Sequence, residues 1–194
     1  MAKREEFSFS EILHTTNSSY SISNDLAQTI WMFAQATDTY NKAFEKKLAM
    51  AHSKITPSEW VTLRLILSAP GPASLTDISR FLSIAIQSVS QLLNKLEKRG
   101  LIKRVRSKDD KRMVKIYITE KGFELLKEIT PFTYDFIKNT SGTLSESEIK
   151  SLYAISRKIR DRCLKMLGLD PSGSDVVLDR LANMISDTPS RTKK

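Results

Sequence analysis

Residues 75–119 read LTDISRFLSIAIQSVSQLLNKLEKRGLIKRVRSKDDKRMVKIYIT, and this stretch decides the fold. A first helical pattern ends near Leu82, and a second runs over residues 86–99 before Gly100 supplies a stop. The rest of the stretch alternates apolar and polar residues on both sides of a charged turn, which is the pattern of a two-stranded β-hairpin. The sequence therefore predicts two short helices followed by a basic hairpin.

Helix, helix and basic hairpin are the order of elements in a winged helix-turn-helix. In that arrangement the second helix enters the major groove of DNA, and the hairpin, or wing, reaches the adjoining minor groove. The net charge of the chain is +9, and residues 98–121 alone carry ten basic and three acidic side chains. Such a cluster is expected where a protein meets a phosphate backbone, although a solvated cationic face without a partner would have the same composition.

The second helix offers hydrogen-bonding side chains that suit base reading. Gln and Asn present a donor and an acceptor together, as adenine requires, and Ser can bond to bases or phosphates. The candidate contacts on this helix are Gln87, Ser88, Ser90, Gln91, Asn94 and Lys95. A solvated polar face is the alternative interpretation of this helix taken alone, and the hairpin directly after it favours readout.

The hairpin supplies the second group of candidate contacts. Its inward positions are expected to be Val105, Val114, Ile116 and Ile118, as in a half-buried strand pair. Arg112 lies near the tip, where a guanidinium can enter the negative potential of a narrow minor groove. Asp110 either holds that guanidinium in position or simply forms the turn, and Lys108 and Lys111 are expected to contact phosphates.

Helix patterns also surround this stretch. A long amphipathic helix is predicted over residues 23–51, and the last long one over residues 145–167. A helix that begins after Thr119 is expected to kink at Pro131. Hydroxyl residues with an acid three positions later mark three helix starts, at Thr56, Ser74 and Ser145.

Over residues 24–167 the chain resembles a regulator of the MarR family. Three motifs carry the resemblance: the run from Val89-Ser90 to Leu96-Glu97-Lys98-Arg99-Gly100-Leu101-Ile102, the wing pair Asp110-x-Arg112, and Ile118-Thr119-Glu120-Lys121-Gly122, where the family usually has Leu-Thr-x-x-Gly. The resemblance implies a homodimer formed by the first and last helices, a pseudo-palindromic operator, and release of DNA when a small, frequently aromatic ligand or an oxidant acts. It matches Asp110 and Arg112 to the family's wing pair, and it places Ser88, Ser90 and Gln91 where the family contacts DNA.

We therefore expect a mainly α fold with a small β-hairpin wing, in which a winged helix-turn-helix lobe joins a helical dimerisation lobe. The expected parts are an N-terminal arm (1–22), a dimerisation helix (23–54), the DNA-binding lobe (55–120), further dimerisation helices (121–168) and a C-terminal extension (169–194). The effector pocket is not assigned. Trp31, Met32, Tyr40, Trp60, Phe132 and Tyr134 either line an aromatic-binding cavity or pack the core.

Motifs of catalysis and metal binding are missing from the sequence. There is no glycine-rich phosphate loop, nucleophile elbow or His-Glu-x-x-His motif, and His14 and His52 are isolated, so we expect no enzyme, cofactor or metal. Cys163 is the only cysteine, and its position on the apolar face of the last helix predicts a buried, inert thiol more than a redox switch. No run approaches the ~18–20 apolar residues of a membrane span, so we expect a cytoplasmic protein with no membrane partner.

These observations predict a sequence-specific, DNA-binding transcriptional regulator. Its partners would be double-stranded DNA, a second copy of itself and a small effector, and it would act as a ligand-responsive repressor. The main alternative is an architectural or non-specific nucleic-acid binder that uses the winged helix only for charge attraction.

Overall fold

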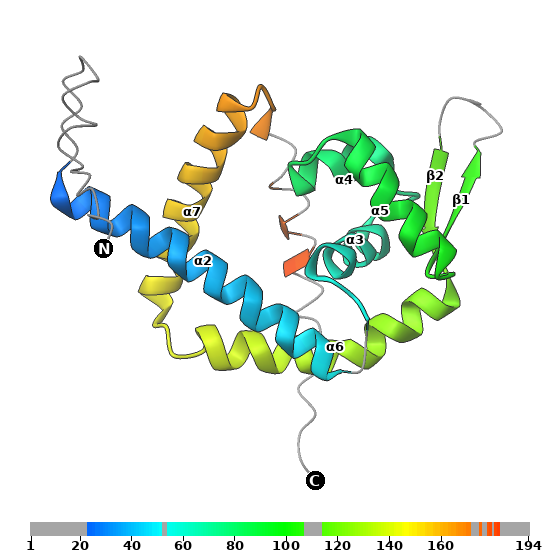
Figure 1. Cartoon of the computed structure of the whole chain (residues 1–194), viewed down its shortest axis with the longest axis horizontal. Helices are drawn as coiled ribbons and strands as arrows, with labels where there is room; N and C mark the ends of the chain where they lie inside the picture. The colour runs from blue at the N-terminus through cyan, green and yellow to red at the C-terminus, as the bar shows by residue number, and fades with distance from the viewer. Residues whose placement is uncertain are drawn as a thin grey trace, which may run out of the picture. The chain divides into compact units, whose positions relative to one another are not determined.

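The computed structural model describes residues 23–51, 54–106 and 114–171, together with residues 175, 178, 179, 181 and 182. In chain order its elements are α2 (Asn24–Met50), α3 (Pro57–Ser68), α4 (Leu75–Leu82), α5 (Ile86–Lys98), β1 (Ile102–Arg106), β2 (Val114–Ile118), α6 (Glu120–Ser141) and α7 (Glu146–Met166) (Figure 1). The described chain is mainly helical with one antiparallel hairpin, which confirms the predicted fold class.

The chain divides into two units within α2, after Tyr40. The described part of the first unit is a single helix whose apolar residues Leu26, Ile30 and Phe33 are 51%, 48% and 38% exposed. The apolar residues of the first unit thus lie at the surface of the single chain.

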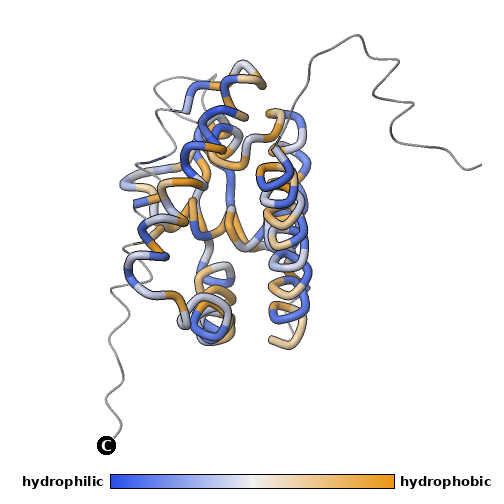
Figure 2. Tube along the Cα trace, turned by 90° about the vertical axis from the view of Figure 1, so that its left-hand side faces the viewer, coloured by the Kyte–Doolittle hydropathy of each residue, from blue (hydrophilic) through white to orange (hydrophobic). Residues whose placement is uncertain are grey.

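The second unit contains the core. Its fully buried side chains come from the end of α2 and from every element from α3 to α6, and include Leu48, Leu63, Ile78, Leu93 and Ile116. Here α3 packs against α4, β2 and α6, while α5 packs against α4 and β1. Along the helices hydrophobic and hydrophilic residues alternate, as in amphipathic helices (Figure 2). The core therefore joins the predicted DNA-binding helices to α6.

The predicted helix starts are confirmed at atomic level. The Thr56 hydroxyl accepts from the Glu59 backbone N–H at 3.3 Å, and the Glu59 carboxylate accepts from the Thr56 N–H at 2.9 Å. The same reciprocal capping box forms between Ser145 and Glu148. These caps satisfy N–H groups that have no partner inside the helix, which is why short sequence signals located α3 and α7 correctly.

Gly122 permits the closest contact between α6 and the hairpin. A Cβ at this position would lie 2.1 Å from the carbonyl oxygen of Leu101 and 2.9 Å from Cγ1 of Ile118. Beside it, the Thr119 hydroxyl donates to the Gly100 carbonyl at 2.6 Å and accepts from the Gly122 N–H at 3.1 Å. The glycine of the Thr-x-x-Gly motif is thus required by the approach of two backbones.

The hairpin differs from the predicted pattern at one position. β1 and β2 pair antiparallel with Ile102 opposite Ile118, and Ala73 bonds to the other side of Ile116 through N···O distances of 3.2 and 3.1 Å. Ile116 is fully buried as expected, but Val105 is 46% exposed, so its predicted inward position is wrong. Arg104 takes the inward position because a carboxylate of α5 receives its side chain.

Pro131 does not interrupt α6. The helix continues from Glu120 to Ser141, and Ile129 and Thr133 are buried on either side of the proline. The Thr130 hydroxyl donates to the Leu126 carbonyl at 2.6 Å in the same turn. The helix thus passes through the proline as one continuous element.

The apolar face of α7 is exposed in the single chain. Ile149, Leu152 and Ile155 are about half exposed. Cys163 is also exposed, so the prediction of a buried thiol is wrong for the single chain, because the helix face that carries it has no cover within the described chain. After Gly168, Asp175 accepts hydrogen bonds from two arginines of α7, Arg157 and Arg160, which ties the start of the C-terminal extension to this helix.

Replacing Gly122 by alanine is expected to destabilise the fold by about 1–3 kcal/mol, because the new methyl group meets a backbone carbonyl that cannot rotate away. Gly71→Ala is the matched control, since nothing lies within 4 Å of a Cβ at that position. Thermal unfolding followed by circular dichroism measures both. Equal melting temperatures for the two variants would contradict the close approach.

Candidate nucleic-acid interface

The orientation of α5 is fixed by three apolar side chains. Val89, Leu93 and Leu96 are fully buried and lie four and three residues apart, so they occupy one face of the helix. The opposite face must then point away from the core. The outward direction of the polar residues of α5 follows from this constraint.

The structure brings most of the predicted base-reading residues onto that outer face. Gln87, Gln91 and Asn94 are exposed and share one stripe with Lys98. Ser88 and Lys95 are exposed one position further round, whereas Ser90 is only partly exposed. The stripe is about three turns long and offers amide donors and acceptors followed by a positive charge.

An ion pair joins α5 to the first strand of the wing. The carboxylate of Glu97 accepts from Arg104 at the backbone N–H (3.1 Å) and at Nε (2.8 Å), and its third contact is with the terminal nitrogen Nη2. Hydrogen bonding from the Arg104 side chain lowers the pKa of Glu97. We call this group the Glu97–Arg104 clamp, and it fixes the angle at which β1 leaves the helix.

The clamp also contacts Asn94, one of the residues predicted to read bases. Nη2 of Arg104 donates to Oδ1 of Asn94 at 2.6 Å, so the amide oxygen of Asn94 already has a donor. Bidentate reading of adenine needs both the oxygen and the nitrogen of the amide. Sequence reasoning missed Glu97 and Arg104. The available signal was that Arg104 lies two residues after the buried Ile102 and therefore on the same side of the strand.

The predicted tip of the wing, with Lys108, Asp110, Lys111 and Arg112, lies outside the described residues. The described part of the hairpin presents exposed Lys103 and Arg106. The Lys103 ammonium lies 5.9 Å from the ring centroid of Tyr117 on the paired strand. Positive charge therefore begins at the base of the hairpin, next to the polar stripe of α5.

A second polar feature lies inside the fold, on α3. Arg64 is only 7% exposed, and burial lowers the pKa of its guanidinium. It lies over the ring of Trp60 at 5.2 Å, and no carboxylate of the described residues forms an ion pair with it. Trp60 itself has a buried indole N–H that finds no acceptor among the described atoms.

Aromatic rings surround this pair of donors. Phe44 contacts Trp60 with ring centroids 5.0 Å apart and Phe136 with centroids 5.1 Å apart. Of the other predicted cavity residues, Phe132 packs against the core, whereas Trp31, Met32 and Tyr134 are largely exposed, and Tyr40 is 41% exposed. Trp60 is thus the predicted aromatic that lies beside an unpaired buried charge.

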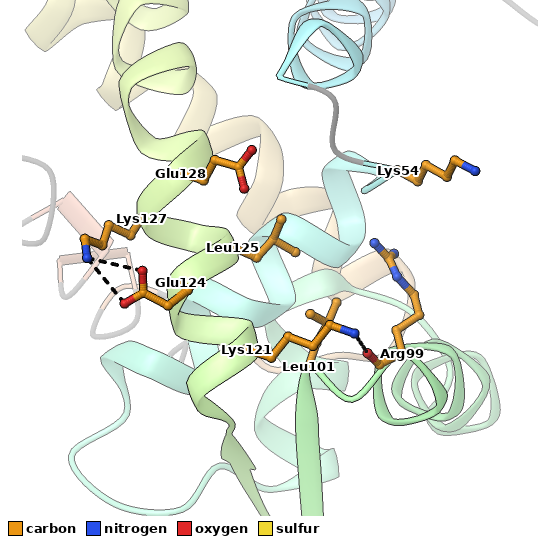
Figure 3. Close-up of a pocket in the computed structure, with 8 residues that line it drawn as sticks. All are labelled: Lys54, Arg99, Leu101, Lys121, Glu124, Leu125, Lys127 and Glu128. Carbon is orange, nitrogen blue, oxygen red and sulfur yellow. Dashed lines mark hydrogen bonds and ion pairs between the residues drawn. The ribbon is translucent and has the colours of Figure 1, made fainter.

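An open hollow lies where the end of α5 meets α6 (Figure 3). Its lining residues are Lys54, Arg99, Leu101, Lys121, Glu124, Leu125, Lys127 and Glu128. Several of its charges have partners: Lys127 pairs with Glu124, Lys121 donates to the Arg99 carbonyl, and Arg99 pairs with the buried Glu59 at 3.1 Å. These contacts give the hollow a structural role in joining α3, α5 and α6.

Within the described ranges no group of three or more His, Cys, Asp or Glu side chains is arranged to hold a metal ion. The described helices likewise include none that is long and apolar enough to span a membrane.

Comparison with known proteins shows that the sequence of this chain is similar to those of transcriptional regulators. A sequence profile of the MarR family matches residues 53–113. The HTH-type transcriptional regulator FarR of Neisseria gonorrhoeae is 31% identical over 130 residues, which are 66% of this chain and 87% of that protein.

Solved structures of other proteins have a similar fold. Sco3205 of Streptomyces coelicolor, a MarR family transcriptional regulator in complex with DNA, superposes with a TM-score of 0.70 at 18% identity, over 75% of this chain and 92% of that one. BpsR of Bordetella bronchiseptica, whose DNA binding is regulated by 6-hydroxynicotinic acid, has a TM-score of 0.60 at 25% identity, over 69% and 99% of the two chains.

Removing the clamp carboxylate is expected to free the first wing strand. In Glu97→Ala the Arg104 amide loses its acceptor, so its hydrogen exchange should become faster. Because the pKa of Glu97 is lowered in the fold, the contribution of the clamp is complete above the ordinary Glu value of about 4.3 and is lost as the pH falls through the lowered value.

Exchange of the Arg104 amide, followed by NMR across this pH range, provides the test. Glu124→Ala is the control, because among the described residues its carboxylate pairs with Lys127 alone, on the surface of α6. If hydrogen exchange of the Arg104 amide is unchanged in Glu97→Ala, the clamp does not couple α5 to the first strand of the wing.

Proposed function

This chain belongs to the MarR family of winged helix-turn-helix transcriptional regulators, and we propose that it binds a pseudo-palindromic operator as a homodimer and represses transcription until a small ligand releases it. Members of this family regulate transcription by binding DNA and are not enzymes. The observation that supports operator reading is the exposed stripe of α5, which a fully buried opposite face holds in place beside a basic hairpin.

In the proposed complex the polar residues have separate roles. Gln87 and Gln91 read base edges, with Ser88, Ser90, Asn94 and Lys95 at the margins of the same groove. Lys108 and Lys111 contact phosphates. Arg112 enters the minor groove, and Asp110 positions it.

The exposed apolar surfaces support dimerisation. Leu26, Ile30 and Phe33 of α2, and Ile149, Leu152 and Ile155 of α7, are each 38% exposed or more in the single chain. Leaving so much apolar surface in water is unfavourable, so we assign it to contacts between two copies. Two recognition helices related by a two-fold axis would enter successive major grooves ~34 Å apart, and the operator would then be an inverted repeat.

Selection of bound duplexes from a random DNA pool tests readout and dimerisation together. We expect an inverted repeat with half-sites one helical turn apart. Gln91→Ala should relax preference at one position of each half-site, whereas Lys108→Ala should weaken all sequences and reduce the salt slope by about one unit.

An architectural binder would behave differently in the same experiment. It would yield no recurrent motif, and its affinities for selected and unselected duplexes would be equal at physiological salt. Identical effects of Gln91→Ala and Lys108→Ala would contradict the proposed division between base and phosphate contacts.

The proposed ligand response is supported by the buried donors of α3. The Trp60 indole N–H is buried without an acceptor among the described atoms, and the neighbouring Arg64 guanidinium is destabilised by burial, so a carboxylate placed beside them would lower the cost of burying these donors. The rings of Phe44 and Phe136 give these donors an apolar, aromatic environment. We therefore assign the effector to the class of small aromatic anions, with its acidic group at Arg64.

Arg64→Met is expected to abolish the response and to leave the melting temperature equal to or above that of the wild type, because it removes a buried charge that has no anion. The measurement is operator affinity by gel shift with and without 6-hydroxynicotinic acid or benzoate. Arg162→Met, at an exposed position of α7, is the control and should respond like the wild type. If neither probe weakens operator binding by the wild type, this ligand class is wrong.

A further inference from the structure

Two isoleucines stand exposed at the start of the recognition helix. Ile84 is 37% exposed and Ile86 is 50% exposed, and they belong to a run, residues 83–88, in which every residue is exposed. Single exposed apolar residues are common on protein surfaces. A continuous exposed run is different, because it shows that the whole N-terminal end of α5 projects from the body of the protein.

The turn before α5 is held firmly in this position. Ser83 has φ 55° and ψ 38°, the one left-handed conformation among the described non-glycine residues. The Ile84 N–H donates to the Ser79 carbonyl at 3.3 Å, and the Ser79 hydroxyl donates back to the Ile84 carbonyl at 2.7 Å. The backbone of Ile84 is thus bonded through both of its polar groups, so the two side chains are presented on a fixed turn.

The position of these side chains coincides with the part of a recognition helix that reaches base edges first. In helix-turn-helix proteins the N-terminal residues of the second helix contact the bases. Ile86 is the first residue of α5 and directly precedes the proposed reader Gln87. Ala85, at the N-cap, carries only a methyl group. This group can neither cover Ile86 nor cap the helix by hydrogen bonding.

An isoleucine cannot hydrogen-bond to a base, so its partner must be apolar. The major-groove edge of unmodified DNA offers one apolar group, the 5-methyl of thymine, and polar groups elsewhere. Burying those polar edges against isoleucine would leave them without partners, which disfavours other bases at the same place. We infer that Ile86, supported by Ile84, contacts the 5-methyl group of a thymine in each half-site and so contributes to specificity.

This inference rests on the proposed operator-binding function and adds a base preference to it. Gln87 and Gln91 suit adenine, and a thymine contact by Ile86 suits the same kind of sequence. The half-site is therefore expected to contain neighbouring A·T pairs where the start of α5 meets the groove.

The test uses the full-length protein and the duplex that the wild type selects from a random pool. Each thymine of one half-site is replaced in turn by deoxyuridine, which removes only the methyl group. For the wild type we expect one position at which the replacement lowers affinity about fourfold, as for the loss of one buried methyl group.

Two variants differ by one methyl group and serve as a matched pair. Ile86→Ser should bind the thymine and uracil duplexes equally, whereas Ile86→Thr keeps a methyl branch on Cβ and should retain part of the discrimination. Both substitutions are at an exposed position, so equal melting temperatures verify that the fold is intact.

The inference fails if no uracil replacement affects the wild type, or if Ile86→Ser discriminates as strongly as the wild type. A recurrent inverted repeat without methyl dependence would overturn only the role of Ile86. The absence of any recurrent motif would overturn the proposed function together with this inference, so the two failures are distinguishable.

Discussion

The complete burial of Val89, Leu93 and Leu96 is the constraint on which the interface depends. A helix rotated by one residue would expose this apolar face and bury amides without partners, and both changes cost free energy. The outward direction of Gln87 and Gln91 therefore needs no contact of their own. This separates stability from readout, because the outer residues can vary while the inner three keep the helix in place.

The wing is anchored at its base by three contacts that differ in kind. The Glu97–Arg104 clamp connects it to α5, the close approach at Gly122 brings α6 against Leu101, and the backbone of Ala73 bonds to Ile116. Each connects the hairpin to a different part of the second unit. The direction of the wing is thus determined jointly by the recognition helix, the turn before α4 and the start of α6.

Much of the fold could be predicted from local signals. Caps such as Thr56 with Glu59 depend only on residues three apart, and the buried face of α5 follows from periodicity. Errors arose where the answer depends on distant contacts. Arg104 took the inward place expected for Val105 because a carboxylate seven residues earlier receives it, and Cys163 is exposed because the face of α7 that carries it is not covered within one chain. Neither fact is visible in hydrophobic patterning.

α3 connects the two proposed activities, DNA binding and the response to a ligand. It carries Trp60 and Arg64, and it packs against α6 as well as against α4 and β2. Among the described residues no carboxylate pairs with the buried Arg64 guanidinium, so in the proposed ligand response an anion that pairs with it would stabilise one arrangement of α3 over another. A ligand shifts that equilibrium only by the difference between its affinities for the two arrangements, and ~1.4 kcal/mol corresponds to tenfold. In the proposed ligand response, the degree of control over DNA binding would therefore be set by how differently Arg64 is paired in the two arrangements, and not by the total affinity of the ligand.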